Sequence, residues 1–216
     1  MKNVRAVKTS LLAFLLTAFL SGTSQVMAAD LGSLSYWDSD GEAIGRWSKS
    51  GSFYLIPDVR AIKLNSTSSV YVHFSHAVDQ WKTALGYPIF VSNDPVTSSS
   101  GMGFWGGTIS EINALGVFSP VPSGINGSCT TNFSIEGTWK HGTMNKDGRL
   151  LSKARGYVVE SNRTANEYKN TSTHELGHAL GWSGHSSGAS TIMYAYGSSV
   201  ISLTNTDTRH LKQVYP

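Results

Sequence analysis

Residues 174–194 read HELGHALGWSGHSSGASTIMY, and this stretch opens with two histidines four positions apart. On a helix, His174 and His178 project from one face, one turn above the other. Two imidazoles so placed can bind one zinc ion, and the carboxylate of Glu175 then lies close enough to take a proton from water at that ion. The stretch therefore predicts a helix that carries a metal site with a carboxylate beside it.

A catalytic zinc ion usually takes three protein ligands and keeps a fourth position for water. No glutamate follows Glu175, and the downstream side chains that could complete the site are His185, Asp207 and His210. The zinc peptidases that take a glutamate from a following helix are thereby disfavoured. Gly181 lets the helix end and the chain turn back, so that His185 can approach the two helical histidines.

At these residues the sequence resembles the metzincin clan of zinc endopeptidases, and within it the matrixin-like family. The family pattern is HExxHxxGxxH, followed by a short loop and a methionine turn beneath the metal. Ser186, directly after the third histidine, and Met193, in the following loop, are similar to the matrixin arrangement. The detailed match spans residues 174–194, and the order of elements agrees more loosely over residues 50–216.

The resemblance implies that His174, His178 and His185 bind one catalytic zinc ion, that Glu175 is the general base and that Met193 floors the site. It implies a secreted zinc endopeptidase that hydrolyses peptide bonds with a zinc-activated water, and a protein or peptide substrate that lies extended along a sheet edge. The implied fold class is α+β: a metzincin-like catalytic domain with a twisted mixed sheet, two long helices, a Met-turn and a C-terminal helix. No residue pattern indicates a structural calcium ion.

The sequence departs from the family pattern at two points. Three residues separate Gly181 from His185, where the pattern has two, so His185 can bind the metal only if the loop bulges by one residue. Gly184 lowers the cost of such a bulge because it has no Cβ, and we therefore favour His185 over a degenerate site. The proline common after the methionine is Ala195 here, which affects the wall of the specificity pocket.

An alternative function is a catalytically impaired, secreted, zinc-stabilised protein that binds a cell-surface polymer. In this hypothesis the extra loop residue has disabled catalysis, and aromatic side chains stack on sugars. The aromatic candidates are Trp37, Trp47, Trp105, Trp139, Tyr194 and Tyr196. Glu175 favours the enzyme, because a purely structural zinc site has no need of a carboxylate beside its first ligand.

Residues 1–28 have the pattern of a signal peptide. Lys2, Arg5 and Lys8 precede an apolar run at 11–20, and a small-residue cleavage site follows. We expect a secreted, extracellular mature chain without a transmembrane segment, with an uncleaved N-terminal anchor as the alternative. Removal of this segment leaves equal numbers of basic and acidic residues, 14 of each, so nothing indicates a nucleic-acid partner.

We expect an irregular lead-in at 29–50 and one zinc-peptidase catalytic domain at 51–216. Apolar positions with helical spacing predict a helix at 70–85, and Ser/Thr-x-x-acid patterns predict helices at 165–180 and 205–214. We expect the chain to be a monomer. Short β-like runs predict strands at 53–56, 87–91, 103–109, 114–118, 133–139 and 156–160.

Other side chains could bind a metal or regulate the site. His73, His76 and Asp79 have a suitable spacing, but we expect a solvated helix face there. The single cysteine, Cys129, excludes an internal disulfide, and we expect it to be a half-buried small residue. Residues 29–60 hold no cysteine that could cap a zinc ion, and although Asp38 or Asp40 could do so, we expect solvated turn residues.

Overall fold

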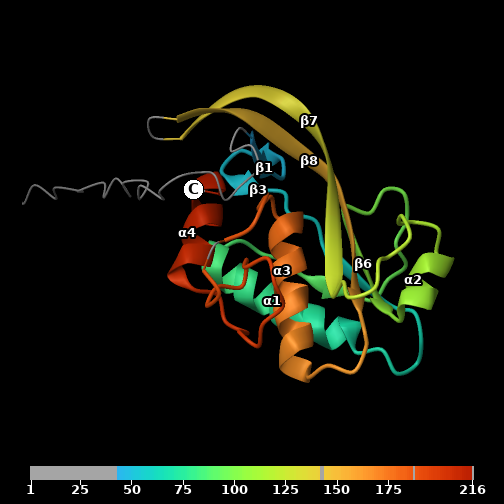
Figure 1. Ribbon diagram of the computed structural model, residues 1–216. Coiled ribbons are helices and arrows are strands. Elements are labelled where there is room, and N and C mark those ends of the chain that lie inside the picture. Colours follow the sequence, from blue (N-terminus) through green and yellow to red (C-terminus); the bar gives the residue numbers. More distant parts are fainter. Residues whose placement is uncertain (1–42, 142–143, 187, 216) are drawn as a thin grey trace, which may run out of the picture.

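The computed structural model describes residues 43–141, 144–186 and 188–215. A twisted sheet and a long β-hairpin lie against two helices, and the hairpin arches away from the body (Figure 1). The fold is α+β, as expected, and the sheet is mixed but mostly parallel. Its strands are β1 (Ala43–Arg46), β4 (Val59–Lys63), β5 (Val91–Ser92), β6 (Met102–Gly107), β7 (Gly127–His141) and β8 (Met144–Val159).

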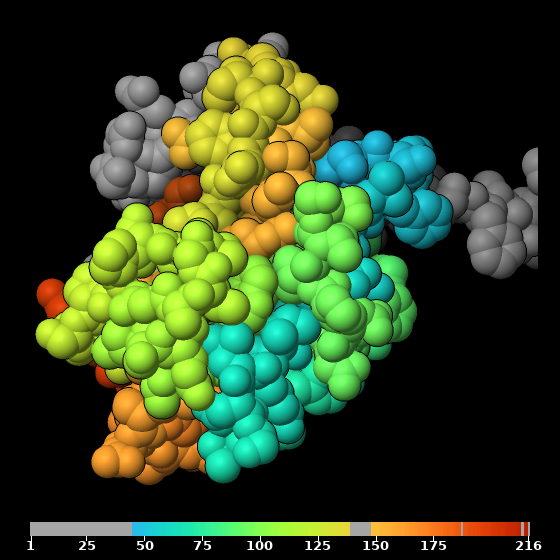
Figure 2. Space-filling model, turned by 90° about the vertical axis from the view of Figure 1, so that its right-hand side faces the viewer, coloured from blue at the N-terminus to red at the C-terminus, as the bar shows by residue number. Residues whose placement is uncertain are grey.

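Strand β8 organises the sheet because it uses both of its edges. On one edge it pairs antiparallel with β7 along almost its whole length. On the opposite edge it pairs in parallel first with β1 and then with β6, which continues the sheet to β4 and β5. No other strand in the described ranges pairs with β7, so β7 is an edge strand. Figure 2 shows the hairpin rising above the face built by the teal and green segments.

Helices α1 (Val70–Leu85) and α3 (Ala165–Ala179) pack side by side against the sheet (Figure 1). The apolar stripe of α1 is buried, as its spacing predicts, and its side chains Phe74 and Trp81 are fully covered. Helix α3 has few large apolar residues, yet most of it is buried, because it lies between α1 and the β7–β8 hairpin. The Trp81 indole N–H donates to the Thr173 carbonyl at 2.8 Å and ties the two helices together.

The beginnings of three helices follow from local capping chemistry. Thr164 and Glu167 form a capping box at α3, and Thr204 and Asp207 form one at α4 (Asn205–Val214), so both helix starts predicted from these patterns are confirmed. A third box at Thr108 starts α2 (Ile109–Ala114), a helix that the sequence analysis missed. The strand expected at 114–118 is wrong, because Ala114 is the last residue of α2 and residues 115–118 form a turn and bends after it.

The lead-in expected at 29–50 is not wholly irregular. Its residues 43–46 form β1, which joins the main sheet, and β2 (Lys49–Ser50) pairs with β3 (Phe53–Tyr54) in a small separate hairpin. The expectation was wrong here because pairing with β8 is a long-range contact that Gly- and Ser-rich sequence does not reveal. The signal peptide expected at 1–28 and the rest of the lead-in up to residue 42 lie outside the described residues. None of the described helices has the length and apolarity to cross a membrane.

Candidate metal centre

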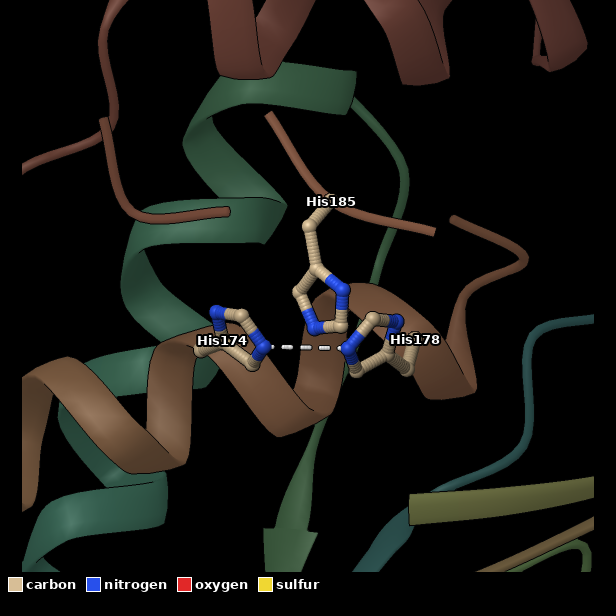
Figure 3. Close-up of side chains that lie close together, drawn as sticks. All are labelled: His174, His178 and His185. Atoms are coloured by element: carbon tan, nitrogen blue, oxygen red, sulfur yellow. Dashed lines mark hydrogen bonds between the residues drawn. The ribbon is translucent and has the colours of Figure 1, made fainter. Parts of the chain in front are cut away.

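Three imidazoles meet at the C-terminal half of α3. His174 and His178 project from the helix and His185 approaches from the loop that follows it (Figure 3). One ligand nitrogen from each ring lies within 4.8 Å of the other two. The described residues hold no other group of three or more His, Cys, Asp or Glu side chains this compact. The structure thus brings together the three histidines on which the sequence analysis settled.

Backbone carbonyls orient the two helical imidazoles. His174 Nδ1 lies 2.8 Å from the Ile192 carbonyl oxygen, and His178 Nδ1 lies 2.7 Å from that of Trp182. Because a carbonyl oxygen can only accept, both Nδ1 atoms must carry the proton. In the neutral rings both Nε2 atoms are therefore bare lone-pair donors, and this arrangement is typical of histidines that bind a metal through Nε2.

The two Nε2 atoms lie 3.0 Å apart, the contact dashed in Figure 3. Burial lowers the pKa of His174 to about 4 and that of His178 to about 3, so neither ring brings a second proton at neutral pH. Two bare lone pairs at this distance repel each other unless a cation lies between them. Zn–N bonds of about 2.0–2.1 Å in tetrahedral geometry place two nitrogens about 3.3 Å apart. The donor set therefore fits a zinc ion.

The loop from α3 to His185 contains the one-residue difference from the family spacing. Gly181 has φ +111° and packs so closely on the Gly45 carbonyl of β1 that a Cβ would collide with it. Gly184 has φ +74°, a left-handed conformation that favours glycine. These two glycines let the longer loop return to the helix and place the His185 ring 5.1 Å from both other rings, measured between centroids.

Met193 lies directly beneath the helix. A Cβ on Gly177 would lie 2.5 Å from Met193 Sδ, so the small residue between the two histidines is needed for this contact. The Ser186 N–H donates to the Met193 carbonyl at 2.7 Å, which joins the turn to the loop that carries His185. The turn therefore packs on the helix between His174 and His178 and is bonded to the loop that carries His185.

Asp207 holds this turn in place from α4. Its carboxylate is fully buried and accepts from the N–H groups of Ile192 at 3.1 Å and Met193 at 3.0 Å. The carbonyl of Ile192 in turn orients His174. Asp207, which the sequence left open as a metal ligand, therefore supports the turn at Ile192 and Met193. His210, the other alternative, packs its ring on Trp182 at 4.7 Å and is likewise not in the cluster.

Glu175 lies in the wall of the same cleft. Its side chain is 5% exposed, and burial raises its pKa to about 8. A Cβ on Gly127 would lie 3.0 Å from Glu175 Oε1, so a glycine at the start of β7 makes room for the carboxylate. The cleft has a volume of about 960 Å³ and is lined by β7, β8, α3, the loop through His185 and the segment after Met193. A carboxylate and three imidazole nitrogens that could bind a metal thus share one open cleft.

Other candidates have different roles. His73 is buried and stacks on Tyr168 of α3 at 5.1 Å, so the solvated face expected there is wrong for this residue, while Asp79 is exposed. His76 Nε2 is bonded to the Ile201 carbonyl at 2.8 Å. Cys129 is a half-buried free thiol on the cleft wall. Asp38 and Asp40 lie outside the described residues.

Four residues contribute to the site in ways that the sequence did not predict. Asp207 was expected as the acidic residue of a capping box and as a possible ligand, but not as the acceptor for the turn at Met193, and Gly177 was not singled out. Asn170, one turn before His174, lines the cleft and donates to the Val200 carbonyl at 2.8 Å, which fixes the cleft wall after the Met-turn. Arg149 reaches the cleft from β8. For Asn170 the sequence held one signal: it lies four residues before His174, so the two side chains share a face of α3.

Two comparisons with known proteins bear on this site. Residues 113–216 match the model of the matrixin family. The chain is also 25% identical over 155 residues to the metalloendoproteinase 1-MMP of Arabidopsis thaliana, an alignment that covers 69% of this chain. The aligned region spans 38% of the length of that relative. The fold, the three histidines above a methionine turn and both comparisons agree that the chain carries a matrixin-like catalytic domain.

Proposed function

We propose that the protein is a zinc-dependent endopeptidase in which His174, His178 and His185 hold one zinc ion and Glu175 is the general base. The observation that carries this proposal is the pair of bare Nε2 atoms 3.0 Å apart, beside a buried carboxylate in an open cleft. A zinc ion on three histidines supplies Lewis acidity, because it polarises a carbonyl oxygen and lowers the pKa of water in its open position to about 7. The remaining chemistry belongs to Glu175 and the cleft.

Glu175 moves one proton in this scheme. Its carboxylate takes a proton from the attacking water as the water oxygen bonds to the peptide carbon, and returns it to the amine nitrogen as the C–N bond breaks. Burial raises its pKa, and a cation at the three histidines lowers it again, so the two effects place the pKa nearer to the working pH. A base with such a pKa can both accept and release the proton near neutral pH.

The edge of β7 is the proposed platform for the substrate. Backbone groups on the free edge of an antiparallel strand can pair with an extended peptide, which gives affinity without reading its sequence. Residues of β7 line the cleft from Gly127 to Phe133, next to Glu175. A peptide paired there would pass its scissile bond over the histidines, and the segment after Met193 would form one wall of a side-chain pocket.

Secretion after removal of residues 1–28, and a catalytic domain beginning near residue 51, remain part of the proposal. They rest on the charged and apolar pattern of the N-terminal segment. We extend the proposed domain from residue 51 back to include β1, and the support for this extension is that β1 pairs with β8 and contacts the loop after α3 at Gly181. Export can be checked by sequencing the N-terminus of the protein recovered from the medium of a secreting host.

The polymer-binding alternative receives little support from the aromatic residues. Trp47 and Trp105 are buried, at 3% and 7% exposure, and cannot stack on a sugar. Trp37 and the side chain of Trp139 lie outside what the structure describes. Tyr194 and Tyr196 line the cleft itself, where they would contact a peptide equally well.

A peptide library tests the proposed function directly. The full chain and its Glu175→Ala variant, each loaded with one equivalent of zinc, are incubated with mixed peptides, and the products are identified by mass spectrometry. We expect internal cuts by the wild type that a chelator abolishes, with the rate falling at least a hundredfold in the variant. A variant that binds zinc and still cuts near the wild-type rate would remove Glu175 from its role.

A further inference from the structure

We propose that the projecting β7–β8 hairpin extends the substrate cleft and selects peptides that carry large apolar side chains about six to eight residues before the scissile bond. This inference rests on the endopeptidase function proposed above and adds a substrate class. The hairpin arches away from the body and rises above the face beside it (Figures 1 and 2). In the described ranges β7 pairs with β8 alone, so one edge of the hairpin is open to an added strand.

One face of β7 continues the wall of the cleft outward. Alternate residues of the strand, Cys129, Thr131 and Phe133, line the cleft, as expected because successive side chains of a strand point to opposite faces. The register shift beside Phe133 places its extra residue on β8, so the alternation of β7 continues without interruption to Ile135. The wall therefore changes along the strand from small side chains near the histidines to two large apolar side chains farther out.

The outer, apolar part of this face is open to solvent. The side chains of Phe133 and Ile135 are 43% and 58% exposed. Leu151, which pairs with Phe133 across the hairpin, is by contrast buried and lies against Gly45 of β1. Alternating apolar and polar residues, as in the run from Phe133 through Ser134 to Ile135, are typical of a strand with one covered face. Strand β1 covers the β8 side of this face, and its β7 side remains accessible to a peptide in the cleft.

Distance and direction identify the occupant as the part of the substrate before the scissile bond. Strand β7 begins beside the proposed base, since a Cβ on Gly127 would lie 3.0 Å from Glu175 Oε1. At a rise of about 3.4 Å per residue, Phe133 lies about 20 Å and Ile135 about 27 Å farther along the strand. Antiparallel pairing is the more stable kind, and a peptide paired in this way with the free edge runs toward Glu175. Its residues before the scissile bond then lie beside Phe133 and Ile135.

Cross-strand contacts set the size of the expected effect. Residues directly opposite each other in an antiparallel pair lie on the same face, where aromatic and aliphatic side chains pair favourably. Each such contact also removes apolar surface from water. We expect two contacts, at Phe133 and Ile135, to raise kcat/KM about tenfold. The gain should appear mainly as a lower KM, because these contacts lie far from the reacting atoms and are the same before and during the reaction.

Two pools of sixteen-residue peptides test this inference on the full chain. The pools are random except at the first and third residues, eight and six positions before the central bond, which are both Leu in one pool and both Ser in the other. We expect the wild type to cut the central bond of the Leu pool about tenfold faster. The ratio should fall toward one in Phe133→Ser and Ile135→Ser and persist in the conservative variant Ile135→Leu. Phe53→Ser is the matched control, because Phe53 is an exposed aromatic residue of β3 that does not line the cleft.

A binding measurement separates this inference from the proposed function. Fluorescence anisotropy of the two labelled pools on the zinc-loaded Glu175→Ala protein reports selection without turnover. Tighter binding of the Leu pool that an added Ile135→Ser change abolishes supports the inference even if no peptide is cut. Equal binding of the two pools, or a Leu preference unchanged by Ile135→Ser, overturns it, whereas cleavage of both pools at one rate would still support the endopeptidase. A dimer in sedimentation that Ile135→Ser dissociates would assign this face to a second copy of the chain and would also overturn the inference.

Discussion

Replacing Asp207 by asparagine should weaken both the fold and the metal site, because one carboxylate supports both. Its Oδ2 accepts from Ile192 N at 3.1 Å and from Thr204 N and Oγ1, each at 2.8 Å, while its Oδ1 accepts from Met193 N at 3.0 Å. An asparagine offers only one oxygen. If that oxygen takes the Oδ2 position, the Met193 N–H faces an NH₂ group and loses its acceptor.

The magnitude follows from these contacts. A buried donor without an acceptor costs about 1–3 kcal/mol, and loss of the negative charge weakens each remaining bond by about 1 kcal/mol. Three bonds remain on this oxygen, so we expect the free energy of unfolding of the metal-free Asp207→Asn protein to fall by about 4–6 kcal/mol. The Ile192 carbonyl that orients His174 should also shift, and lost orientation of a histidine ligand costs about 10–100-fold in metal affinity.

Urea denaturation of the metal-free protein measures the first effect, and chelator competition for zinc measures the second. Thr204→Val is the matched control, because it removes the side-chain half of the same capping box without touching the two N–H groups of the turn. It should cost about 1 kcal/mol and leave the zinc affinity unchanged. Equal zinc affinity in Asp207→Asn and Thr204→Val, or a loss of stability in Asp207→Asn no larger than in the control, would refute the role of Asp207 as a clamp.

Three further predictions concern packing, pH and metal. Gly177→Ala should lower the free energy of unfolding by about 1 kcal/mol, because the new Cβ would lie 2.5 Å from Met193 Sδ, even though alanine normally favours a helix. A variant that is more stable than the wild type in urea denaturation would contradict the Met193 contact. Burial, with Lys169 and Arg163 nearby, lowers the pKa of His73 from 6.5 to about 4. Between these two pH values the unfolded chain binds a proton at His73 that the folded chain does not bind. The metal-free protein should therefore lose stability as the pH falls from 6.5 to about 4. His73→Gln should flatten that slope by up to about 1.4 kcal/mol per pH unit in urea titrations, and an unchanged slope would count against this assignment. Zinc at a hundredfold excess over Kd should stabilise the wild type by about 2.7 kcal/mol and the His174→Ala variant far less. Thermal melting with and without a chelator measures the difference. Equal stabilisation of both proteins would place the zinc elsewhere.

Local patterns predicted helices α1, α3 and α4 and placed two histidines on one face of α3. The apolar stripe of α1 and the capping boxes at Thr164 and Thr204 depend on residues a few positions apart, which a sequence displays directly. The two helical histidines follow from the same periodicity. The α2 box at Thr108 is equally local, but its short helix lies in a Gly- and Ser-rich region and was not predicted; only its first and last residues fell within the strands expected at 103–109 and 114–118.

Long-range contacts could not be read in the same way. The pairing of β1 with β8, the burial of His73 under Tyr168 and the approach of Arg149 to Phe133 each join residues whose spacing carries no periodic signal. Asp207 shows the difference well. Its capping role was evident from the sequence, whereas its bonds to Ile192 and Met193 depend on how the final helix docks.

We propose that the three imidazoles hold one zinc ion despite the extra residue between Gly181 and His185. Zinc X-ray absorption of the loaded wild type and of His185→Ala tests this arrangement. We expect three nitrogen ligands at about 2.0–2.1 Å and one oxygen in the wild type, with one nitrogen fewer in the variant. An identical zinc environment in both proteins would show that His185 is not a ligand.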